Sequence, residues 1–213
     1  MTKKKTVLPE ILLPAFCLLF YLFLFFLDGV NLSADSQSYI DFTYGREPFY
    51  PLFLAFFRLL FGAGFYFKAV VFVQCLLWAV SMYALTKTVC EKVQGGVFSA
   101  CVLVFFQAAV VFLCRVVAAR HATYCNEICS EGIAIPLFTL LLTELSAYST
   151  DYKNSRLITS MFIGALLIST RKQMYIVVLI MGALYFFLWT ARKIPVKKML
   201  CLLYTSPSPR DTR

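Results

Sequence analysis

Acidic side chains that could do chemistry stand in two stretches of a very apolar sequence. Asp35 and Asp41 lie in the first stretch with Tyr39 between them, and Glu127 and Glu131 lie in the second, at a spacing that shares one face of a helix. Carboxylates from two loops that meet at one membrane face could supply a general base or bind a divalent cation. Residue type alone favours a simpler alternative, in which they are solvated loop charges or face a helix macrodipole.

Basic side chains accompany these acids. They are Arg46, Arg58, Arg115, Arg120, Arg171 and Lys172. Because the guanidinium fork binds phosphate in a bidentate manner, a lipid phosphate is a candidate ligand. Snorkelling to the headgroups explains Arg58 and Arg115 equally well, but it explains Arg171 less well, since Arg171 follows a short apolar segment. The single histidine, His121, is predicted to be an interfacial polar residue rather than a base.

Several kinds of site are not indicated. The sequence has no Gly-rich phosphate loop, Ser-His-Asp pattern or metalloprotease helix. The eight cysteines lie mostly inside apolar runs and predict small buried side chains rather than disulfides or metal ligands. No cofactor is therefore assigned, although a divalent cation stays open.

The composition places these residues in a membrane protein. Of the 213 residues, 61% are hydrophobic and 15% are charged, against about 45–50% and about 25% in soluble domains. A net charge of +9 would suggest nucleic-acid binding in a soluble chain. Here the basic residues cluster between apolar runs, so they indicate topology, and no nucleic-acid partner is expected.

The elements that must position the charged residues are membrane-spanning helices. Apolar segments occur at 9–27, 66–86, 95–113, 131–149, 157–170 and 173–191. Since about 20 residues cross a bilayer, we predict an all-α polytopic bundle with about six spans, of which the fifth is short.

The distribution of Lys and Arg predicts the orientation. With the N-terminus in the cytoplasm, 11 of these residues fall on the cytoplasmic side and 7 on the other. The long connection 28–65 is then extracytoplasmic. Pro51 is typical of a helix start, and the apolar residues after it predict an interfacial helix in this loop. A loop of this length is usually functional.

The C-terminal residues 201–213 differ from the rest. Their composition changes abruptly, and residues 201–211 translate an oligonucleotide that resembles the end of a transposase sequencing adapter. We therefore interpret 201–213 as a sequencing artefact and 1–200 as the N-terminal part of a longer membrane domain.

With these residues in view, the first loop resembles that of the polytopic type-C (GT-C) glycosyltransferases, which include protein O-mannosyltransferases and the lipid A aminoarabinose transferase. Asp35 with Tyr39 four residues later matches the family's loop motif, and Arg46 precedes a Pro-x-Tyr element that ends at Tyr50. Ser130-Glu131-Gly resembles the second acidic position of the family. Ser169-Thr170-Arg171-Lys172 is similar to its basic position after a short span.

The resemblance implies transfer of a sugar from a polyprenyl-phosphate-linked donor to a lipid, glycan or protein acceptor at the extracytoplasmic face, in a bacterial plasma membrane. It makes Asp35 and Glu131 the catalytic candidates. The substrate-binding candidates are Tyr39, Tyr50, Arg46, Arg171 and Lys172. Some members of the family use a divalent metal and others do not.

A different class of function stays open. The same charges could line a path in a flippase or transporter of lipid-linked saccharides that performs no transfer. Transporters usually carry polar groups near the midplane and internal repeats. The charges here gather on one predicted face and no repeat is found, so the sequence favours the enzyme.

Overall fold

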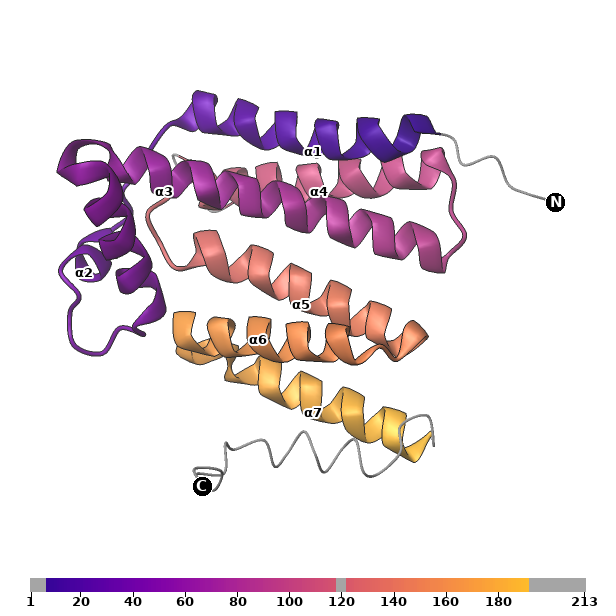
Figure 1. Cartoon of the computed structure of the whole chain (residues 1–213). Coiled ribbons are helices and arrows are strands. Elements are labelled where there is room, and N and C mark those ends of the chain that lie inside the picture. Colours follow the sequence, from indigo (N-terminus) through magenta and orange to yellow (C-terminus); the bar gives the residue numbers. More distant parts are fainter. Residues whose placement is uncertain (1–6, 118–121, 192–213) are drawn as a thin grey trace, which may run out of the picture. The chain divides into compact units, whose positions relative to one another are not determined.

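The computed structural model describes residues 7–117 and 122–191, and these form helices joined by loops (Figure 1). The chain divides into two compact units, Met1–Met174 and Tyr175–Arg213. The described helices of the first unit are α1 (Val7–Asp28), α2 (Ser36–Ile40), α3 (Phe49–Lys92), α4 (Val97–Val117), α5 (Glu131–Asp151) and α6 (Asn154–Thr170). The short 3₁₀ helices η1 (Tyr124–Asn126) and η2 (Lys172–Met174) belong to the same unit, and α7 (Tyr175–Thr190) belongs to the second.

Helix α3 is the centre of the first unit, where it contacts α1, α4, α5 and α6. Its buried residues recur every three or four positions, as expected for one packed face of a helix. They include Val70, Val71, Gln74, Cys75, Ala79, Met82 and Thr86. Helix α4, in contrast, exposes most of its apolar side chains, such as Phe98, Phe105 and Phe106. In a membrane these side chains would face lipid.

The prediction of helices that are long and apolar enough to cross a membrane is confirmed for four of the six predicted spans. Four described helices are long and apolar enough to cross a membrane: α1, α3, α4 and α5. The other two predicted spans correspond to α6 and α7, which have 17 and 16 residues and so fall short of the roughly 20 that a perpendicular crossing needs.

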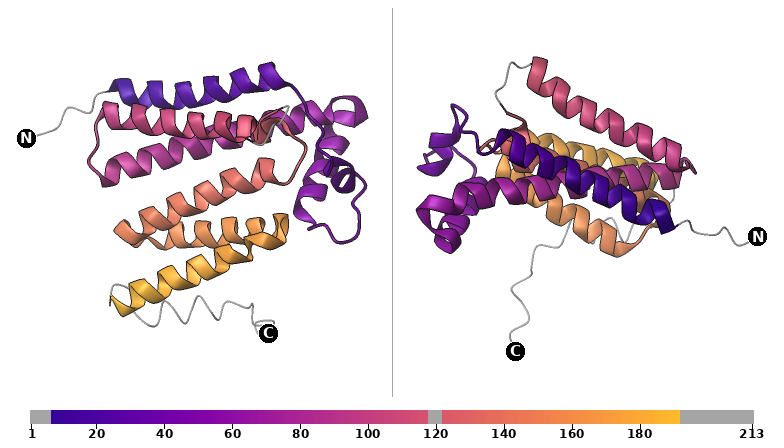
Figure 2. Two further views of the ribbon diagram at one scale, coloured as in Figure 1. Left: turned by 180° about the vertical axis from the view of Figure 1, so that it is seen from behind. Right: turned by 90° about the horizontal axis from the view of Figure 1, so that it is seen from above.

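Helix α3 agrees in outline with the sequence prediction at its start. We expected a helix from Pro51 and a separate span from residue 66; α3 runs from Phe49 to Lys92, but it consists of two helices that meet at a kink at Gly62. Gly62 has φ 69° and ψ 168°, a backbone conformation open to glycine and unfavourable for other residues. The break divides α3 into a first arm, 49–61, and a longer second arm, 63–92, which point in different directions (Figure 2).

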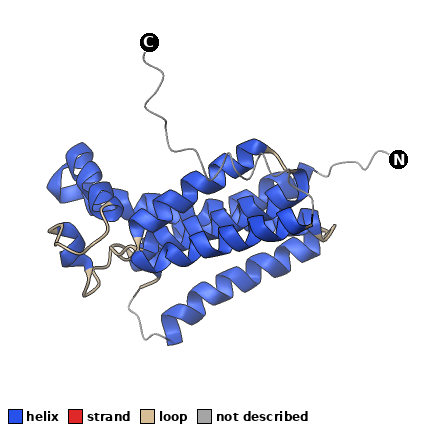
Figure 3. Ribbon diagram, turned by 90° about the horizontal axis from the view of Figure 1, so that it is seen from below, coloured by secondary structure: helices blue, strands red, loops and turns tan. Residues whose placement is uncertain are grey.

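Loops gather at one end of the described helices of the first unit (tan in Figure 3). Here the connection 29–48, which carries α2, lies beside the segment 122–130, which contains η1 and precedes α5, because the Ser36 hydroxyl donates to the carbonyl of Ile128. Asn31 joins the two loops, because its amide donates to the carbonyl of Asn126 and its carbonyl accepts from the amide of Ile128, both at 2.9 Å. The proposed artefact at 201–213 lies outside the described residues.

Candidate functional site

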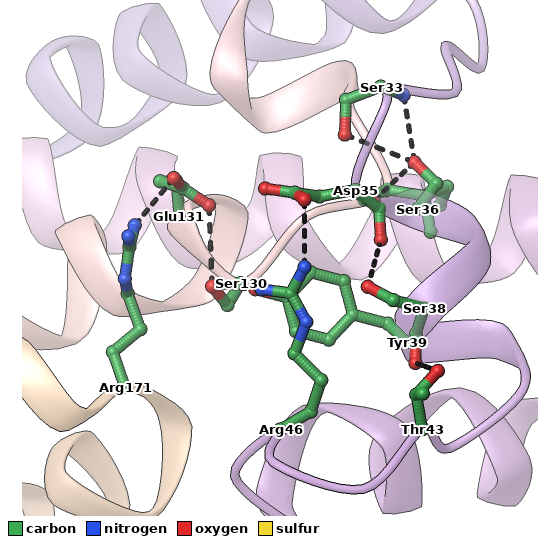
Figure 4. A network of polar contacts seen from close by, with 11 residues as sticks. Ser33, Asp35, Ser36, Ser38, Tyr39, Thr43, Arg46, Ser130, Glu131 and Arg171 are labelled. Carbon is green, nitrogen blue, oxygen red and sulfur yellow. Dashed lines mark hydrogen bonds and ion pairs between the residues drawn. The ribbon is translucent and has the colours of Figure 1, made fainter.

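The first-loop motif forms a compact cluster around α2 (Figure 4). Asp35 directly precedes α2, and one of its carboxylate oxygens lies 2.7 Å from a terminal nitrogen of Arg46. The Arg46 guanidinium stacks 4.5 Å from the centre of the Tyr39 ring and donates to the Tyr39 hydroxyl at 3.2 Å. Three residues that the sequence singled out are thus in mutual contact.

The charge state of Arg46 follows from these neighbours. Although burial acts to lower it, the pKa of the Arg46 guanidinium is raised, because the side chain is hydrogen-bonded to Asp35 and lies against Tyr39. The side chain of Asp35 is 66% exposed, whereas that of Arg46 is 30% exposed. Arg46 is therefore a fixed cation beside an accessible carboxylate.

A chain of polar contacts continues from this cluster to α5 and to the end of α6. The Tyr39 hydroxyl lies 2.9 Å from the Ser130 hydroxyl, and Ser130 donates to Glu131 at 3.3 Å. The other carboxylate oxygen of Glu131 forms an ion pair with Arg171, which directly follows α6. Three segments far apart in sequence thus place two carboxylates and two guanidinium groups in one polar network. We call Asp35, Tyr39, Arg46, Ser130, Glu131 and Arg171 the ion-pair chain.

Lys172 ties the end of α6 to the first loop. Its ammonium group donates to the carbonyl of Gly45 at 3.2 Å and lies 3.7 Å from a carboxylate oxygen of Glu47. Gly45 has a φ of 98°, which favours glycine at this turn. Lys172 directly follows Arg171 and therefore borders the ion-pair chain. Its side chain is 67% exposed, so solvent can reach it.

Tyr50 lies below the ion-pair chain and not on its surface. It is fully buried, its ring packs edge-on against Tyr39 at 5.1 Å between centroids, and its hydroxyl donates to Gln74 at 2.9 Å. Tyr50, which was predicted to bind substrate, therefore exposes no surface with which it could do so. Tyr50 supports Tyr39 instead.

The support extends through Gln74, which the sequence analysis did not single out. Its side-chain amide donates to the carbonyls of Cys125 and Glu127, at 3.0 Å and 2.9 Å. These bonds satisfy the backbone of a buried non-helical segment, which would otherwise carry unpaired polar groups. A glutamine inside an apolar helix is itself a signal of such a role, because a polar side chain is costly there unless it is paired.

Asn126 plays a similar part in the same segment. Its amide donates to the carbonyls of Leu24 and Gly29, and its oxygen accepts from Thr123 at 3.0 Å. The segment is thereby fixed to the end of α1. Ser36 adds a bond from α2 to the carbonyl of Ile128 at 2.6 Å.

The prediction that Glu127 and Glu131 share a helix face is wrong. Helix α5 begins at Glu131, and Glu127 lies in extended backbone before it, with φ −90° and ψ 143°. Bonds of the 122–130 segment to Gln74 and Asn31 compete successfully with helix formation there. The Glu127 side chain is 4% exposed, and Glu131 alone joins the ion-pair chain.

Other charged residues of the predicted extracytoplasmic connections do not join the ion-pair chain. Asp28 is buried and pairs with Arg115 at 2.9 Å, while its second oxygen accepts from the amide of Thr123. Asp41 accepts from the side chain of Gln37 on the surface. Arg58 is exposed on the first arm of α3. Arg120 and His121 lie outside the described residues.

No metal centre is assembled in the described ranges, which contain no group of three or more His, Cys, Asp or Glu side chains that could hold an ion. Asp35 and Glu131 each face an arginine instead. The three cations, Arg46, Arg171 and Lys172, each face a carboxylate, so an anion would bind here by displacing a carboxylate from its cation.

Comparisons with protein-family models, curated proteins and solved structures give no match to this chain.

Proposed function

We propose that the chain is the N-terminal part of an integral-membrane glycosyltransferase that resembles the type-C group. In this proposal it transfers a sugar from a polyprenyl-phosphate-linked donor to a lipid, glycan or protein acceptor at the extracytoplasmic face. Six helices cross a bacterial plasma membrane, with α6 and α7 as the short crossings, and the N-terminus is cytoplasmic. The observation that carries the proposal is the ion-pair chain, which joins Asp35 and Arg46 to Glu131 and Arg171.

The proposed reaction needs a base and a phosphate site, and the ion-pair chain offers both. The acceptor hydroxyl attacks the anomeric carbon of the donor, the bond from that carbon to the phosphate oxygen breaks, and the hydroxyl proton passes to Asp35. Arg46 and Arg171 hold the negative charge on the departing polyprenyl phosphate. Glu131 orients the acceptor or supports a divalent cation. Lys172, at the edge, adds a third positive charge.

The pairing of Asp35 with Arg46 describes the site before donor binds. A donor phosphate competes with the Asp35 carboxylate for the same guanidinium nitrogens, because each group can offer two anionic oxygen acceptors to the arginine fork. When the phosphate takes Arg46, the Asp35 carboxylate is released from its ion pair and its oxygens are open to the acceptor hydroxyl. Donor binding would thus prepare the carboxylate for the acceptor.

The test is a transfer assay on the protein produced from the reading frame continued beyond Leu200, with radiolabelled polyprenyl-phosphate sugars. Asp35→Asn should lower the rate about a hundredfold or more and leave membrane insertion unchanged. Asp41→Asn is the matched control, because Asp41 is also exposed in this loop but bonds only to Gln37 among the described side chains. Wild-type activity in Asp35→Asn would refute the role given to Asp35.

The alternative of a flippase predicts a different result in the same material. Lipid-linked saccharide would cross the membrane of reconstituted vesicles without being transferred to an acceptor. The ion-pair chain lies at one end of the helices, beside the first loop, rather than along them, and this favours transfer.

A further inference from the structure

An apolar groove lies on a different side of the same end of the first unit. Its volume is about 760 Å³, which is in the range of ligand sites, roughly 300–1,000 Å³. The end of α1 contributes Phe25 and Gly29, the first arm of α3 contributes Phe57 and Phe61, and the second arm contributes side chains from Phe65 to Val73. The groove exists because α3 turns at Gly62, so that its two arms form two of the walls.

Aromatic rings form a continuous wall in this groove. Phe57 stacks on Phe61 with ring centroids 5.8 Å apart, and Phe61 lies 6.3 Å from Phe65. On the other side the rings of Phe25 and Phe72 meet edge-on at 5.8 Å. Flat apolar surfaces of this kind suit a flexible hydrocarbon chain, which gains contact area without needing a polar partner.

Lys68 is the only charged residue that lines the groove among the described residues. Its side chain is exposed, and its ammonium group lies 5.9 Å from the centre of the Phe65 ring. No carboxylate of the described part of the chain forms an ion pair with it. A cation beside an apolar groove is complementary to a molecule that has a hydrocarbon chain and an anionic head.

The position of the groove along the helices also suits a molecule with a hydrocarbon chain and an anionic head. Gly29, which directly follows α1, lines the groove, and the adjacent loop residues belong to the end that carries the ion-pair chain. Asp28 ends a helix that is long and apolar enough to cross a membrane, so in a bilayer this end would lie near the headgroups. Lys68 can therefore reach a phosphate while the phenylalanines contact the acyl region.

We propose that this groove binds one acyl chain of an anionic glycerophospholipid from the surrounding bilayer, with its phosphate at Lys68. The groove shares no lining residue with the ion-pair chain, where the proposed sugar donor would place its own phosphate. The lipid is therefore a separate ligand. The proposal does not depend on the transferase activity.

The test uses the protein produced from the reading frame continued beyond Leu200, purified in detergent, with phosphatidylglycerol and phosphatidylcholine that carry identical acyl chains. Native mass spectrometry counts the lipids retained. We expect one phosphatidylglycerol to be retained in preference to phosphatidylcholine, and Lys68→Gln to weaken that retention about fivefold.

Lys87→Gln is the matched control. Lys87 is also exposed on α3 and lies 5.8 Å from the centre of an aromatic ring, that of Tyr83, but it does not line the groove. Lys87→Gln should retain the lipid as the wild type does. Equal retention of the two lipids, or equal losses in the two lysine variants, would overturn the proposal.

A second measurement tests whether the acyl chain contacts the apolar lining of the groove. A phosphatidylglycerol with a photoactivatable group on its acyl chain should cross-link to Phe61, Phe65 or Phe72. Ala69→Leu places a larger side chain in the groove wall and should reduce this cross-linking while Lys68 is intact. Cross-links confined to other helices would contradict the proposal. Displacement of the probe by one equivalent of a polyprenyl phosphate would also contradict it, and would assign the groove to the sugar donor.

Discussion

The hydroxyl of Tyr39 lies 2.9 Å from the hydroxyl of Ser130, and this contact joins α2 to the residue before α5. The two residues are 91 positions apart in sequence and both are buried. Tyr39 also accepts from Arg46, and Ser130 also donates to Glu131. Tyr39 thus helps to position the Asp35–Arg46 pair, and Ser130 helps to position the Glu131–Arg171 pair. We therefore expect a substitution at Tyr39 to change the position of the Glu131 side chain.

A double-mutant cycle measures the free energy that couples the Tyr39 hydroxyl to the Ser130 hydroxyl. Tyr39→Phe and Ser130→Ala should each lower the free energy of unfolding by about 1–1.5 kcal/mol, since each leaves a buried hydroxyl without one partner. The double variant should cost less than the sum, because the second change removes a group that the first has already left unpaired.

Thermal unfolding of the detergent-solubilised protein checks this cycle. Tyr44→Phe is the control, because Tyr44 belongs to the same loop and is fully exposed. Its unfolding temperature should equal that of the wild type. Additive losses at Tyr39 and Ser130 would show that the two hydroxyl groups act independently.

Gly132 is predicted to be intolerant of a side chain. A Cβ atom at this position would lie 2.5 Å from Nε2 and 2.7 Å from Cδ of Gln74. Gln74 is fully buried and holds the carbonyls of Cys125 and Glu127, so it cannot move without breaking those bonds. Gly132→Ala should therefore destabilise the protein by about 2 kcal/mol or more.

Gly64→Ala is the matched control for this substitution. Gly64 lies within α3, and a Cβ there would meet nothing within 4 Å. Alanine has the higher helix propensity, so Gly64→Ala should leave the unfolding temperature unchanged or raise it. If Gly132→Ala behaves in the same way, Gln74 does not hold the 122–130 segment as described.

The sequence predicted more of the ion-pair chain than of the buried contacts that hold it in place. Asp35, Tyr39 and Arg46 are close together in the chain, so a local motif was enough to group them, and the structure brings them into contact. The contact of Tyr39 with Ser130 depends on how the 122–130 segment packs, and no local pattern encodes that packing. The same is true of the bonds from Gln74 to this segment. The shared helix face expected from the spacing of Glu127 and Glu131 is absent for this reason, because tertiary bonds hold Glu127 in extended backbone before α5.

Helix boundaries show the same contrast between what local sequence predicts and what depends on the rest of the structure. Apolar runs predicted α1, α4 and α5 to within a few residues, since a membrane span needs length and apolar composition more than any particular partner. The two helices predicted before and after residues 61–65 are present within α3, but they meet directly at Gly62. Hydropathy alone cannot distinguish that arrangement from two helices joined by a loop.

The buried ion pair of Asp28 and Arg115 predicts a strong effect of removing one partner. The side chain of Asp28 is 1% exposed, and Arg115 lies 2.9 Å from it. Arg115→Gln should destabilise the protein by about 3 kcal/mol, because it leaves a buried carboxylate without its cation. The double variant Asp28→Asn with Arg115→Gln should recover part of this loss, since no charge is then buried.

Unfolding in detergent measures these variants, with Arg58→Gln as the control for loss of an exposed arginine. That control should change the free energy of unfolding by less than about 0.5 kcal/mol. An Arg115→Gln variant as stable as Arg58→Gln would mean that water or another side chain compensates Asp28.

The orientation of the protein can be tested at two exposed positions. The excess of Lys and Arg in alternate connections predicts a cytoplasmic N-terminus, which places Tyr44 outside and Lys153 inside. Tyr44 is fully exposed in the first loop, and Lys153 is exposed between α5 and α6. An epitope inserted after Tyr44 should bind antibody on intact spheroplasts, whereas one inserted after Lys153 should bind only after permeabilisation. The opposite pattern would put the ion-pair chain on the cytoplasmic side and would contradict transfer at the extracytoplasmic face, even if every contact described above were retained.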